Sequence, residues 1–499
     1  MSESLQTGPA SDAGYETVIG LEVHAQVLTA SKMFCGCAAS YADSEPNTAT
    51  CPVCLGLPGA LPVMNAVAVE KVLATGLTLG CSIPSYNKQD RKSYFYPDLP
   101  KGYQVSQYDL PLCVDGELLF TSDGEEKRAG ITRVHLEEDT GRLLHRTAED
   151  GSEESLIDLN RAGVPLMEIV GEPDLRSAQE ACDYLAALRQ ILRYTSASTG
   201  NMEEGAFRCD ANVSVRRRGI SELGQKVEIK NLNSFRAVQR ALEFETKRQV
   251  KALEAGQPVP QETRGWVEEQ GVTVGQRTKE DAHDYRYFPE PDLPPLHIEA
   301  AHVEAVRELL PEMPAARRAR FVTEFELPVA DAVQLCAERM LADAFEGALG
   351  SNPADRRIKA AANWIINDLA GLAAQRGLGP GMLPITGEQL GELLDLIESG
   401  AITVRAAKEL VPELEAGESP RAGAERRTLL TLEDQDVISN AVAAAMAANP
   451  AAVQDFRNGK QAAIGRLIGE TMKRTGGRAS PDAVRTSLTD ALNETAATA

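Results

Sequence analysis

The sequence predicts an α+β protein with a β-rich N-terminal domain, an all-α helical domain after it and a small helical tail domain at the end. The first part of the chain is rich in Gly, Pro, Tyr and Asn and in short alternating or apolar segments, which are typical of strands and loops. The composition changes at the Pro-rich stretch Pro289–Pro295. Beyond it Ala, Leu, Glu and Arg dominate at near-helical apolar spacing, which predicts the helical domains.

These changes divide the chain into five segments. Residues 1–14 are small and polar and predict a disordered leader, and residues 15–296 form the β-rich domain. Residues 297–411 predict the helical domain, residues 412–427 a linker of mostly Glu, Gly, Ser, Pro, Ala and Arg, and residues 428–499 the helical tail. A chain of 499 residues is long enough for about three domains with sizeable cores.

The overall charge limits the functions that the chain can have. The net charge is −22, from 51 basic and 73 acidic residues, which argues against a general nucleic-acid binder because phosphate neutralisation needs Lys and Arg. Local basic patches are still compatible with an acidic body. We find no signal peptide and no apolar run of about 20 residues, so we expect a cytoplasmic protein without a membrane partner.

The segment Glu16–Gln26 alternates as a strand does. Ile19, Leu21, Val23 and Ala25 share one parity, while Glu22, His24 and Gln26 share the other. Successive strand side chains point to opposite faces. A carboxylate and an imidazole on one strand face can contact the same divalent metal ion. The alternative is an ordinary half-buried strand with a polar face exposed to water.

Four cysteines form the strongest local pattern. Cys35 and Cys37 lie close together, and Cys51 and Cys54 follow after a short loop. Four thiols in two close pairs can surround zinc tetrahedrally, as in structural zinc sites. A disulfide pair and four unconnected thiols are the alternatives, and a reducing cytoplasm disfavours the disulfide. The other five cysteines are scattered and predict small buried apolar residues.

Carboxylates recur in short apolar segments of the β-rich domain. Glu137 and Glu138 follow one such segment, Glu168 has apolar neighbours, and Asp210 lies in a third segment. A carboxylate inside an apolar strand is costly unless it is paired or metal-bound. Hard oxygen ligands with few imidazoles suit Mg²⁺ better than zinc. The alternative for each of these residues alone is a surface salt bridge.

Two cationic stretches are candidates for phosphate or RNA contacts. Residues 88–104 interleave Lys92, Lys101 and other cations with aromatic residues, a combination that can bind phosphates and stack bases. Residues 455–485 are locally basic within the acidic chain. The alternatives are a folded loop with Lys stems packed on Tyr rings for the first stretch, and a solvated helix face for the second.

Several common catalytic patterns do not occur in the sequence. It has no P-loop, no dinucleotide fingerprint and no nucleophile elbow, so any use of ATP must follow another architecture. It also has no Cys/His or Ser–Lys arrangement that would indicate an amidase.

Eight motifs in order carry a family resemblance that runs from about residue 15 to the end of the chain. Together they resemble the B-subunit family of tRNA-dependent aspartyl/glutamyl amidotransferases, GatB. The motifs are Glu16–His24, Arg91–Asp98, His135–Asp139, Asp158–Arg161, Met202–Gly205, Arg208–Asn212, Lys230–Ser234 and Asp284–Pro291. Any one of them is weak evidence, whereas eight in this order are specific.

The resemblance implies an enzyme of three subunits, with a glutaminase A subunit, this B subunit and a small C subunit. The B subunit uses ATP and Mg²⁺ to phosphorylate the side-chain carboxylate of Glu on tRNA(Gln) or Asp on tRNA(Asn). Ammonia channelled from the A subunit then gives Gln-tRNA(Gln) or Asn-tRNA(Asn). Residues 15–296 would be the catalytic cradle with a zinc knuckle, and residues 428–499 a YqeY-like tail that binds tRNA.

The resemblance also implies roles for single residues. Glu22, His24, Glu138 and Glu168 fall in segments that look like the family's metal-site motifs, while the ATP ligands stay unassigned. The expected catalytic residues are Glu22, His24, Glu138, Glu168, Lys92 and Lys101, the two lysines as phosphate or channel contacts. The expected Mg²⁺ ligands are Glu22, His24, Glu137, Glu138, Glu168 and Asp210. The expected Zn²⁺ ligands are Cys35, Cys37, Cys51 and Cys54.

Two other functions remain open at this level. One is a non-catalytic, zinc-stabilised adaptor that binds tRNA, which the cysteines and the basic tail favour. The other is a free-standing ligase that joins ammonia to a small amino acid, which would act without tRNA or partner chains.

Overall fold

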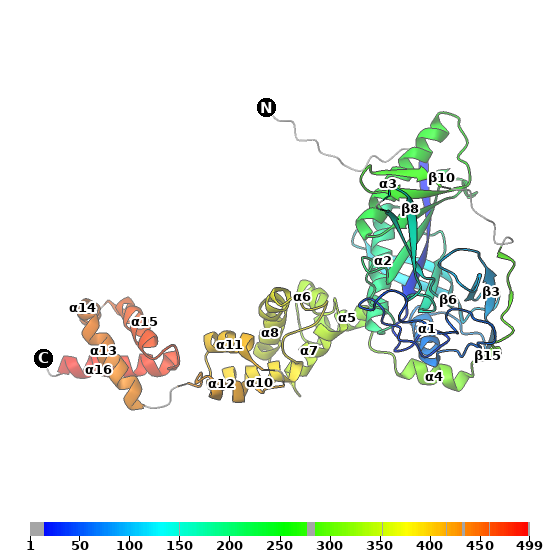
Figure 1. The fold of residues 1–499 in the computed structure, drawn as a ribbon. Coiled ribbons are helices and arrows are strands. Elements are labelled where there is room, and N and C mark those ends of the chain that lie inside the picture. Colours follow the sequence, from blue (N-terminus) through cyan, green and yellow to red (C-terminus); the bar gives the residue numbers. More distant parts are fainter. Residues whose placement is uncertain are drawn as a thin grey trace. The chain divides into compact units, whose positions relative to one another are not determined.

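A computed structural model describes residues 14–148, 150–276, 285–351, 353–415, 417–431, 435–458 and 460–497. The chain divides into two compact units, Met1–Met313 and Pro314–Ala499. All of the predicted leader except Gly14 lies outside the described residues. In the part of the chain that is described, no helix is long and apolar enough to span a membrane. The order of a sheet-rich region followed by helices confirms the predicted α+β class (Figure 1).

An eight-stranded sheet organises the first unit, in the order β13-β12-β11-β10-β1-β9-β6-β5. All neighbouring strands are antiparallel except β11 and β12, which are parallel. The strands are β1 (Tyr15–Gln26), β5 (Cys113–Ser122), β6 (Glu125–Glu138), β9 (Pro165–Gly171), β10 (Phe207–Arg217), β11 (Val227–Leu232), β12 (Glu262–Val267) and β13 (Val272–Gly275). β1 therefore lies inside the sheet, with β9 on one side and β10 on the other.

The apolar parity of β1 faces a helical layer. Ile19 and Val23 are fully buried and share one core with α1 (Ala66–Thr78), α2 (Ala178–Tyr194) and α3 (Phe235–Glu254). Each helix begins after a side-chain cap, because Asn65, Ser177 and Ser234 accept hydrogen bonds from backbone N–H groups of the first turn. The opposite parity of β1 is thus left for polar side chains.

Within the described part of the first unit, three small sheets accompany the large one. Their strand orders are β14-β3-β4, β15-β2 and β7-β8. The strands are β2 (Tyr86–Asn87), β3 (Asp90–Ser93), β4 (Tyr103–Ser106), β7 (Arg142–Thr147), β8 (Glu153–Asp158), β14 (Phe288–Pro289) and β15 (Leu296–His297). The first unit also includes α4 (Ala300–Glu308), because Val306 packs into its core. The unit boundary at Met313 therefore differs from the predicted one after residue 296.

The second unit is helical and contains two separate cores. The first core is built from α5 (Pro314–Glu324), α6 (Val329–Leu335), α7 (Arg339–Leu349), α8 (Asp355–Asn363), the π-helix η2 (Trp364–Leu369), α9 (Ala370–Gln375), α10 (Gly387–Glu398), α11 (Val404–Leu410), the 3₁₀ helix η3 (Val411–Glu413) and α12 (Pro420–Arg426). The second is built from α13 (Gln435–Ala448), α14 (Pro450–Arg457), α15 (Ile464–Arg474) and α16 (Pro481–Ala497), and the 3₁₀ helix η4 (Gln461–Ala463) lies between α14 and α15 in the chain.

The segment predicted as a linker, residues 412–427, contains structure of its own. Ser419 caps α12, Pro420 begins it, and Ala424 is fully buried in the first helical core. Gly423 lies so close to Leu414 and Leu410 that a Cβ atom would meet their side chains at 2.6 and 3.1 Å. The small residues that predicted a linker therefore permit close packing of a short helix.

Candidate metal centres

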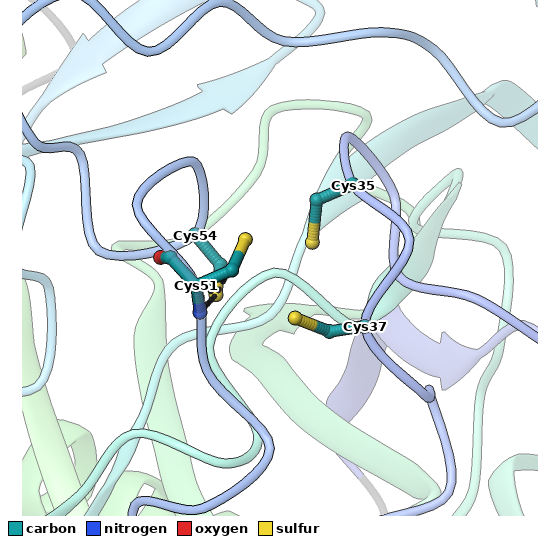
Figure 2. A group of neighbouring side chains, drawn as sticks. All are labelled: Cys35, Cys37, Cys51 and Cys54. Carbon is teal, nitrogen blue, oxygen red and sulfur yellow. Dashed lines mark hydrogen bonds between the residues drawn. The ribbon is translucent and has the colours of Figure 1, made fainter.

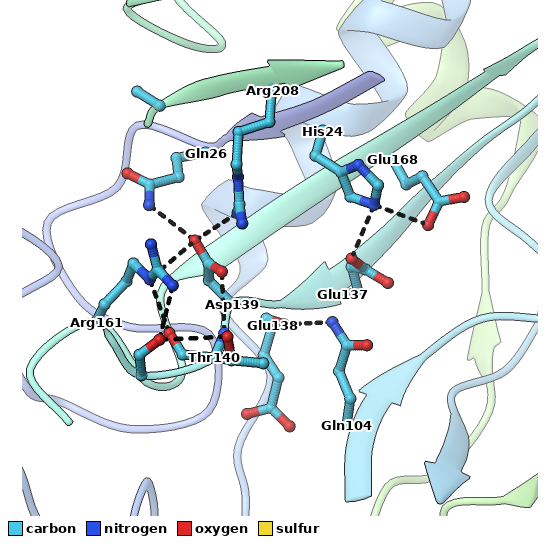
Figure 3. Close-up of polar contacts among 12 residues, drawn as sticks. His24, Gln26, Gln104, Glu137, Glu138, Asp139, Thr140, Arg161, Glu168 and Arg208 are labelled. Atoms are coloured by element: carbon cyan, nitrogen blue, oxygen red, sulfur yellow. Dashed lines mark hydrogen bonds and ion pairs between the residues drawn. The ribbon is translucent and has the colours of Figure 1, made fainter. Parts of the chain in front are cut away.

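Strand register brings polar residues of three strands into one row. His24 of β1 lies opposite Glu168 of β9, and Glu168 lies opposite His135 of β6. Because β9 is between the other two strands, Glu168 is flanked by an imidazole on each side. Figure 3 shows the His24 side of this row. Cross-strand neighbours on one face have Cβ atoms about 5 Å apart, so the side chains of this row can share one ligand.

The side-chain distances confirm that the row is a cluster. Glu168 Oε2 is 3.3 Å from His24 Nε2 and 3.3 Å from His135 Nε2. Glu137, two residues after His135 on β6, places its carboxylate oxygens 3.8 Å from His24 Nε2 and 3.6 Å from His135 Nε2. We call His24, His135, Glu137 and Glu168, together with Glu22, the sheet cluster. Its two overlapping groups, Glu22–His24–Glu168 and His135–Glu137–Glu168, each have ligand atoms within 4.8 Å of one another.

His135, Glu137 and Glu168 of the sheet cluster are buried, Glu22 and His24 are half-buried, and the charges of the cluster interact strongly. Burial lowers the pKa of His24, but the hydrogen bond and charge of Glu168, with Glu137 and Glu22, outweigh burial and raise the pKa to about 9. For Glu168, burial raises the pKa, but His135 and His24 outweigh burial and hold the pKa well below its usual range. Protonated imidazoles thus neutralise carboxylates here. A divalent cation can replace those protons, since buried carboxylates need a positive partner.

The donor atoms fit a divalent metal ion. The cluster offers carboxylate oxygens from three glutamates and nitrogens from two histidines. Ser106 supports the cluster, because its hydroxyl donates a hydrogen bond of 2.9 Å to Glu137 Oε2 and both residues are buried. Such a partner fixes the orientation of a metal-binding carboxylate. The oxygen-rich set is compatible with the predicted Mg²⁺.

Glu138 does not join the sheet cluster, contrary to the prediction. It follows Glu137 directly, so its side chain leaves β6 on the opposite face (Figure 3). There it forms an ion pair with Lys101, and its Oε1 accepts a hydrogen bond of 2.9 Å from the backbone N–H of Val105. This pair lines a cavity of about 190 Å³, together with Phe34 and other residues of the cysteine loops.

Lys92 and Asp210 lie beside the sheet cluster rather than in it. Both line a cleft of about 300 Å³ with His24 and Glu137. Asp210 pairs with Lys230 at 3.3 Å. Burial lowers the pKa of Lys92, but the negative charge of Glu137 and other neighbours outweighs burial and raises it. Lys92 therefore stays a cation at the edge of the cluster.

A second buried carboxylate, Asp139, adjoins the cleft and was not predicted as a site residue. Its Oδ2 accepts hydrogen bonds from Arg208 at 2.7 Å and Gln26 at 2.8 Å, and Arg161 lies at 3.7 Å (Figure 3). Burial raises the pKa of Asp139, but the two arginines lower it below its usual value. His135 was missed as well. The strand parity that it shares with Glu137 could have identified it.

The four predicted thiols come together between two loops. The sulfur atoms of Cys35, Cys37, Cys51 and Cys54 all lie within 4.8 Å of one another (Figure 2). The sulfurs of Cys51 and Cys54 are 3.9 Å apart, close to the spacing of about 3.8 Å that Zn–S bonds of about 2.3 Å give in a tetrahedron. All four are free thiols. The donor set therefore fits zinc and argues against the disulfide alternative.

Comparisons with known proteins find matches in both the N-terminal and the C-terminal part of the chain. The family model of the GatB/GatE catalytic domain matches residues 17–304, and that of the GatB domain matches residues 343–492. The chain is similar to the aspartyl/glutamyl-tRNA(Asn/Gln) amidotransferase B subunit of Thermomicrobium roseum, with 53% identity over 96% of this chain and 99% of the relative. The same-named proteins of Moorella thermoacetica and Dehalococcoides mccartyi are 51% and 48% identical, over 96% of this chain and 100% and 99% of those relatives.

Proposed function

The chain belongs to the family of aspartyl/glutamyl-tRNA(Asn/Gln) amidotransferase B subunits, and from this premise we propose that its sheet cluster activates the substrate carboxylate. The substrate is the side-chain carboxylate of Glu on tRNA(Gln) or of Asp on tRNA(Asn), and ATP is the co-substrate. The observation that carries the proposal is the row of His24, Glu168 and His135 across three strands, whose half-buried member His24 lines an open cleft.

The chemistry requires activation because a carboxylate is a poor electrophile and oxide is a poor leaving group. A carboxylate oxygen attacks the γ-phosphorus of ATP, the bond to the bridging oxygen breaks, and ADP leaves. Ammonia then attacks the carbonyl carbon of the acyl phosphate. Inorganic phosphate leaves with the bonding electron pair, the nitrogen loses a proton, and the amide remains.

The sheet cluster supports the first of these steps. Glu22, His24, Glu137 and Glu168 would hold Mg²⁺, with His135 beside them. When bound, Mg²⁺ supplies the positive charge that offsets repulsion between the ATP phosphates and the substrate carboxylate.

Cations of this chain bind and orient the substrates in the adjoining cleft. Lys92, Lys230 and Arg208 line the cleft of about 300 Å³ with His24 and Asp210. An ammonium or guanidinium group at this position forms charge-assisted hydrogen bonds to phosphate oxygens. Asp139 holds Arg208 in place through the hydrogen bond of 2.7 Å. We assign Lys92 a phosphate contact on these grounds.

Glu138 and Lys101 serve a different step in this proposal. Their ion pair lines the separate cavity on the other face of β6, away from the sheet cluster. A polar, charged lining is suited to small polar molecules. We therefore propose that this pair contacts ammonia arriving from a glutaminase A subunit, in a heterotrimer with a small C subunit.

The zinc knuckle and the tail complete the proposal. Structural zinc at the four thiols would join the two cysteine loops, which also line the cavity that contains Glu138 and Lys101. Arg466, Lys473 and Arg485 are exposed on α15 and α16, and we propose that they contact the tRNA backbone. All nine cysteines are free thiols, which supports a cytoplasmic location.

The direct test is ATP consumption by the purified three-subunit complex. We expect Glu-tRNA(Gln) or Asp-tRNA(Asn) to stimulate ADP release, and chelation of Mg²⁺ to abolish the stimulation. Correctly acylated Gln-tRNA(Gln) is the control and should have no effect. A complex that binds tRNA but shows no stimulated ADP release would disprove activation and favour the adaptor. Stimulation by free glutamate would favour the ligase.

A further inference from the structure

Lys32 is a buried lysine beside the four thiols. Only 1% of its surface is exposed. Its ammonium donates a hydrogen bond of 2.7 Å to the Ala49 carbonyl and lies 3.8 Å from Cys54 Sγ. Among the residues that the structure describes, these are the contacts of the ammonium, and neither is with a carboxylate. The negative partner available to Lys32 is therefore sulfur.

Charge balance explains why a lysine lies at this position. An ammonium removed from water is costly unless an anion accompanies it. Four thiolates around one zinc ion carry a net double negative charge, which is also costly in a buried site. One ammonium against Cys54 halves the net charge of the filled site and gives Lys32 its counter-ion.

Lys32 also connects the two cysteine loops. Its backbone N–H donates a 2.8 Å hydrogen bond to the Cys37 carbonyl, which closes the first loop. Its side chain reaches Ala49, just before the second pair of thiols. Ala49 is held in turn, because its N–H donates to the side chain of Asn160 at 2.8 Å and Asn160 is fully buried. One residue thus fixes the spacing of both pairs.

We propose that Lys32 is a positioning residue of the zinc knuckle, whose ammonium neutralises part of the charge of the metal-bound thiolates. This inference rests on the proposed zinc site at the four thiols. It assigns Lys32 no contact with ATP, ammonia or tRNA. The cleft beside the sheet cluster is lined by other lysines, Lys92 and Lys230.

Metal affinity of the full-length chain tests the proposal. Lys32→Met keeps most of the unbranched side chain and removes its charge, and Lys32→Arg keeps the charge. Lys127→Met removes an ammonium that pairs with Glu125 on the surface. Zinc content is measured after dialysis against graded concentrations of a chelator. We expect Lys32→Met to weaken zinc binding about 10–100-fold, the range for partners of metal ligands. Lys127→Met should match the wild type, and Lys32→Arg should recover most of the affinity.

Cobalt substitution provides a readout that packing alone would not change. Removing a cation from a thiolate raises the energy of its electrons, so the sulfur-to-cobalt charge-transfer band of Lys32→Met should move to longer wavelength. An unchanged band and unchanged affinity would overturn the proposal. Equal loss of affinity in Lys32→Met and Lys32→Arg, without a band shift, would also overturn it, because packing would then be the cause.

Two further outcomes keep the test decisive. If Lys32→Met does not fold by circular dichroism, Lys32→Gln takes its place with the same expectations. If the wild type holds no more zinc than Cys51→Ser/Cys54→Ser, the zinc site itself is refuted, and the role of Lys32 with it. That result is distinguishable from a zinc-binding wild type whose affinity does not depend on Lys32.

Discussion

The cysteine loops and the sheet cluster are two metal-type sites in one unit, and they are built in opposite ways. The four thiols come from two short loops close in sequence, whereas Glu22, His24, His135, Glu137 and Glu168 come from three strands of one sheet. The sheet cluster is held by backbone ladders on both sides. The thiols are held by single contacts such as that of Lys32 with Ala49.

This contrast indicates a division of labour. A site on paired strands keeps its geometry without a metal ion, because the ladder hydrogen bonds and the ion pairs between imidazole and glutamate are already in place. It can therefore bind and release a catalytic ion in a fixed frame. A site on loops obtains its order from the ion. We expect metal loss to affect chemistry at the sheet and local structure at the loops.

The largest expected effect is on catalysis. Glu168→Gln removes the carboxylate that lies between two histidines, and ATP consumption by the complex should fall about 10²–10³-fold, because several kcal/mol of charge stabilisation are lost. Glu172→Gln is the control, since Glu172 follows β9 and bonds the Thr132 hydroxyl instead of the cluster. The measurement is tRNA-stimulated ADP release. Equal rates for the two variants would remove the sheet cluster from the mechanism.

The next effect concerns Asp139, a buried carboxylate whose negative charge is balanced by two arginines instead of a metal ion. Asp139→Asn breaks a buried ion pair and should lower the free energy of unfolding by about 3 kcal/mol at neutral pH. The folded pKa of Asp139 is lowered from its ordinary value of 3.8. The stabilisation is therefore complete above the unfolded pKa and is lost as pH falls through the lower folded pKa.

Urea unfolding of both proteins between neutral and strongly acidic pH checks this prediction. The stability difference between wild type and Asp139→Asn should be constant above about pH 5 and should shrink at lower pH. Arg208→Met leaves the carboxylate but removes its closest cation, so it should destabilise the protein in the same pH range. A difference that grows on acidification would contradict the assigned sign.

The same contrast explains which features the sequence could predict. All four thiols were predicted, because a Cys-x-Cys and a Cys-x-x-Cys pair carry their geometry in local spacing. The parity of β1 predicted that Glu22 and His24 share a face, but it could not name Glu168 as partner, because strand register is a long-range property. The motif indicated both Glu137 and Glu138 as site residues. Only the alternation of side chains along β6 shows that the two carboxylates lie on opposite faces of the sheet.

Local sequence patterns predicted some helices of the fold correctly and missed another. Helical spacing in the sequence predicts helices at about residues 65–79, 177–195 and 234–255, and α1 to α3 begin and end within one residue of these bounds. Residues 412–427 were predicted as a linker from their small and charged composition alone. Buried Ala424 and Gly423 show that small residues also serve close helix packing, a tertiary effect that composition does not reveal.

A smaller effect tests the loops. Stripping zinc from the wild type, or substituting Cys51→Ser/Cys54→Ser, should raise amide hydrogen exchange in residues 34–57 about tenfold or more, because the ion supplies local folding energy. Exchange in β1 and β9 should stay unchanged, because their hydrogen bonds belong to the ladder. Mass-spectrometric exchange on the full-length chain measures both. If the strands exchange faster as well, the loops and the sheet are one cooperative unit, and the contrast fails.

The smallest effect compares supporting residues. Ser106→Ala removes the hydroxyl that bonds Glu137 at 2.9 Å and should weaken Mg²⁺ or Mn²⁺ binding about tenfold, the lower end for partners of metal ligands. Ser122→Ala is the matched control, because Ser122 is also buried and its hydroxyl bonds the Asp183 carboxylate at 2.7 Å. Ser122 lies at the far end of the β5–β6 ladder, opposite Glu125.

Manganese binding followed by electron paramagnetic resonance separates the two serine variants. Both lose one hydrogen bond from a buried hydroxyl to a carboxylate, so both should lose similar stability, about 1.5–3 kcal/mol. Only Ser106→Ala should weaken ion binding, because only its carboxylate belongs to the sheet cluster. Equal manganese affinity in both variants would mean that the strand frame alone orients Glu137. The sheet cluster would then need no supporting residue of the kind that Lys32 provides for the thiols.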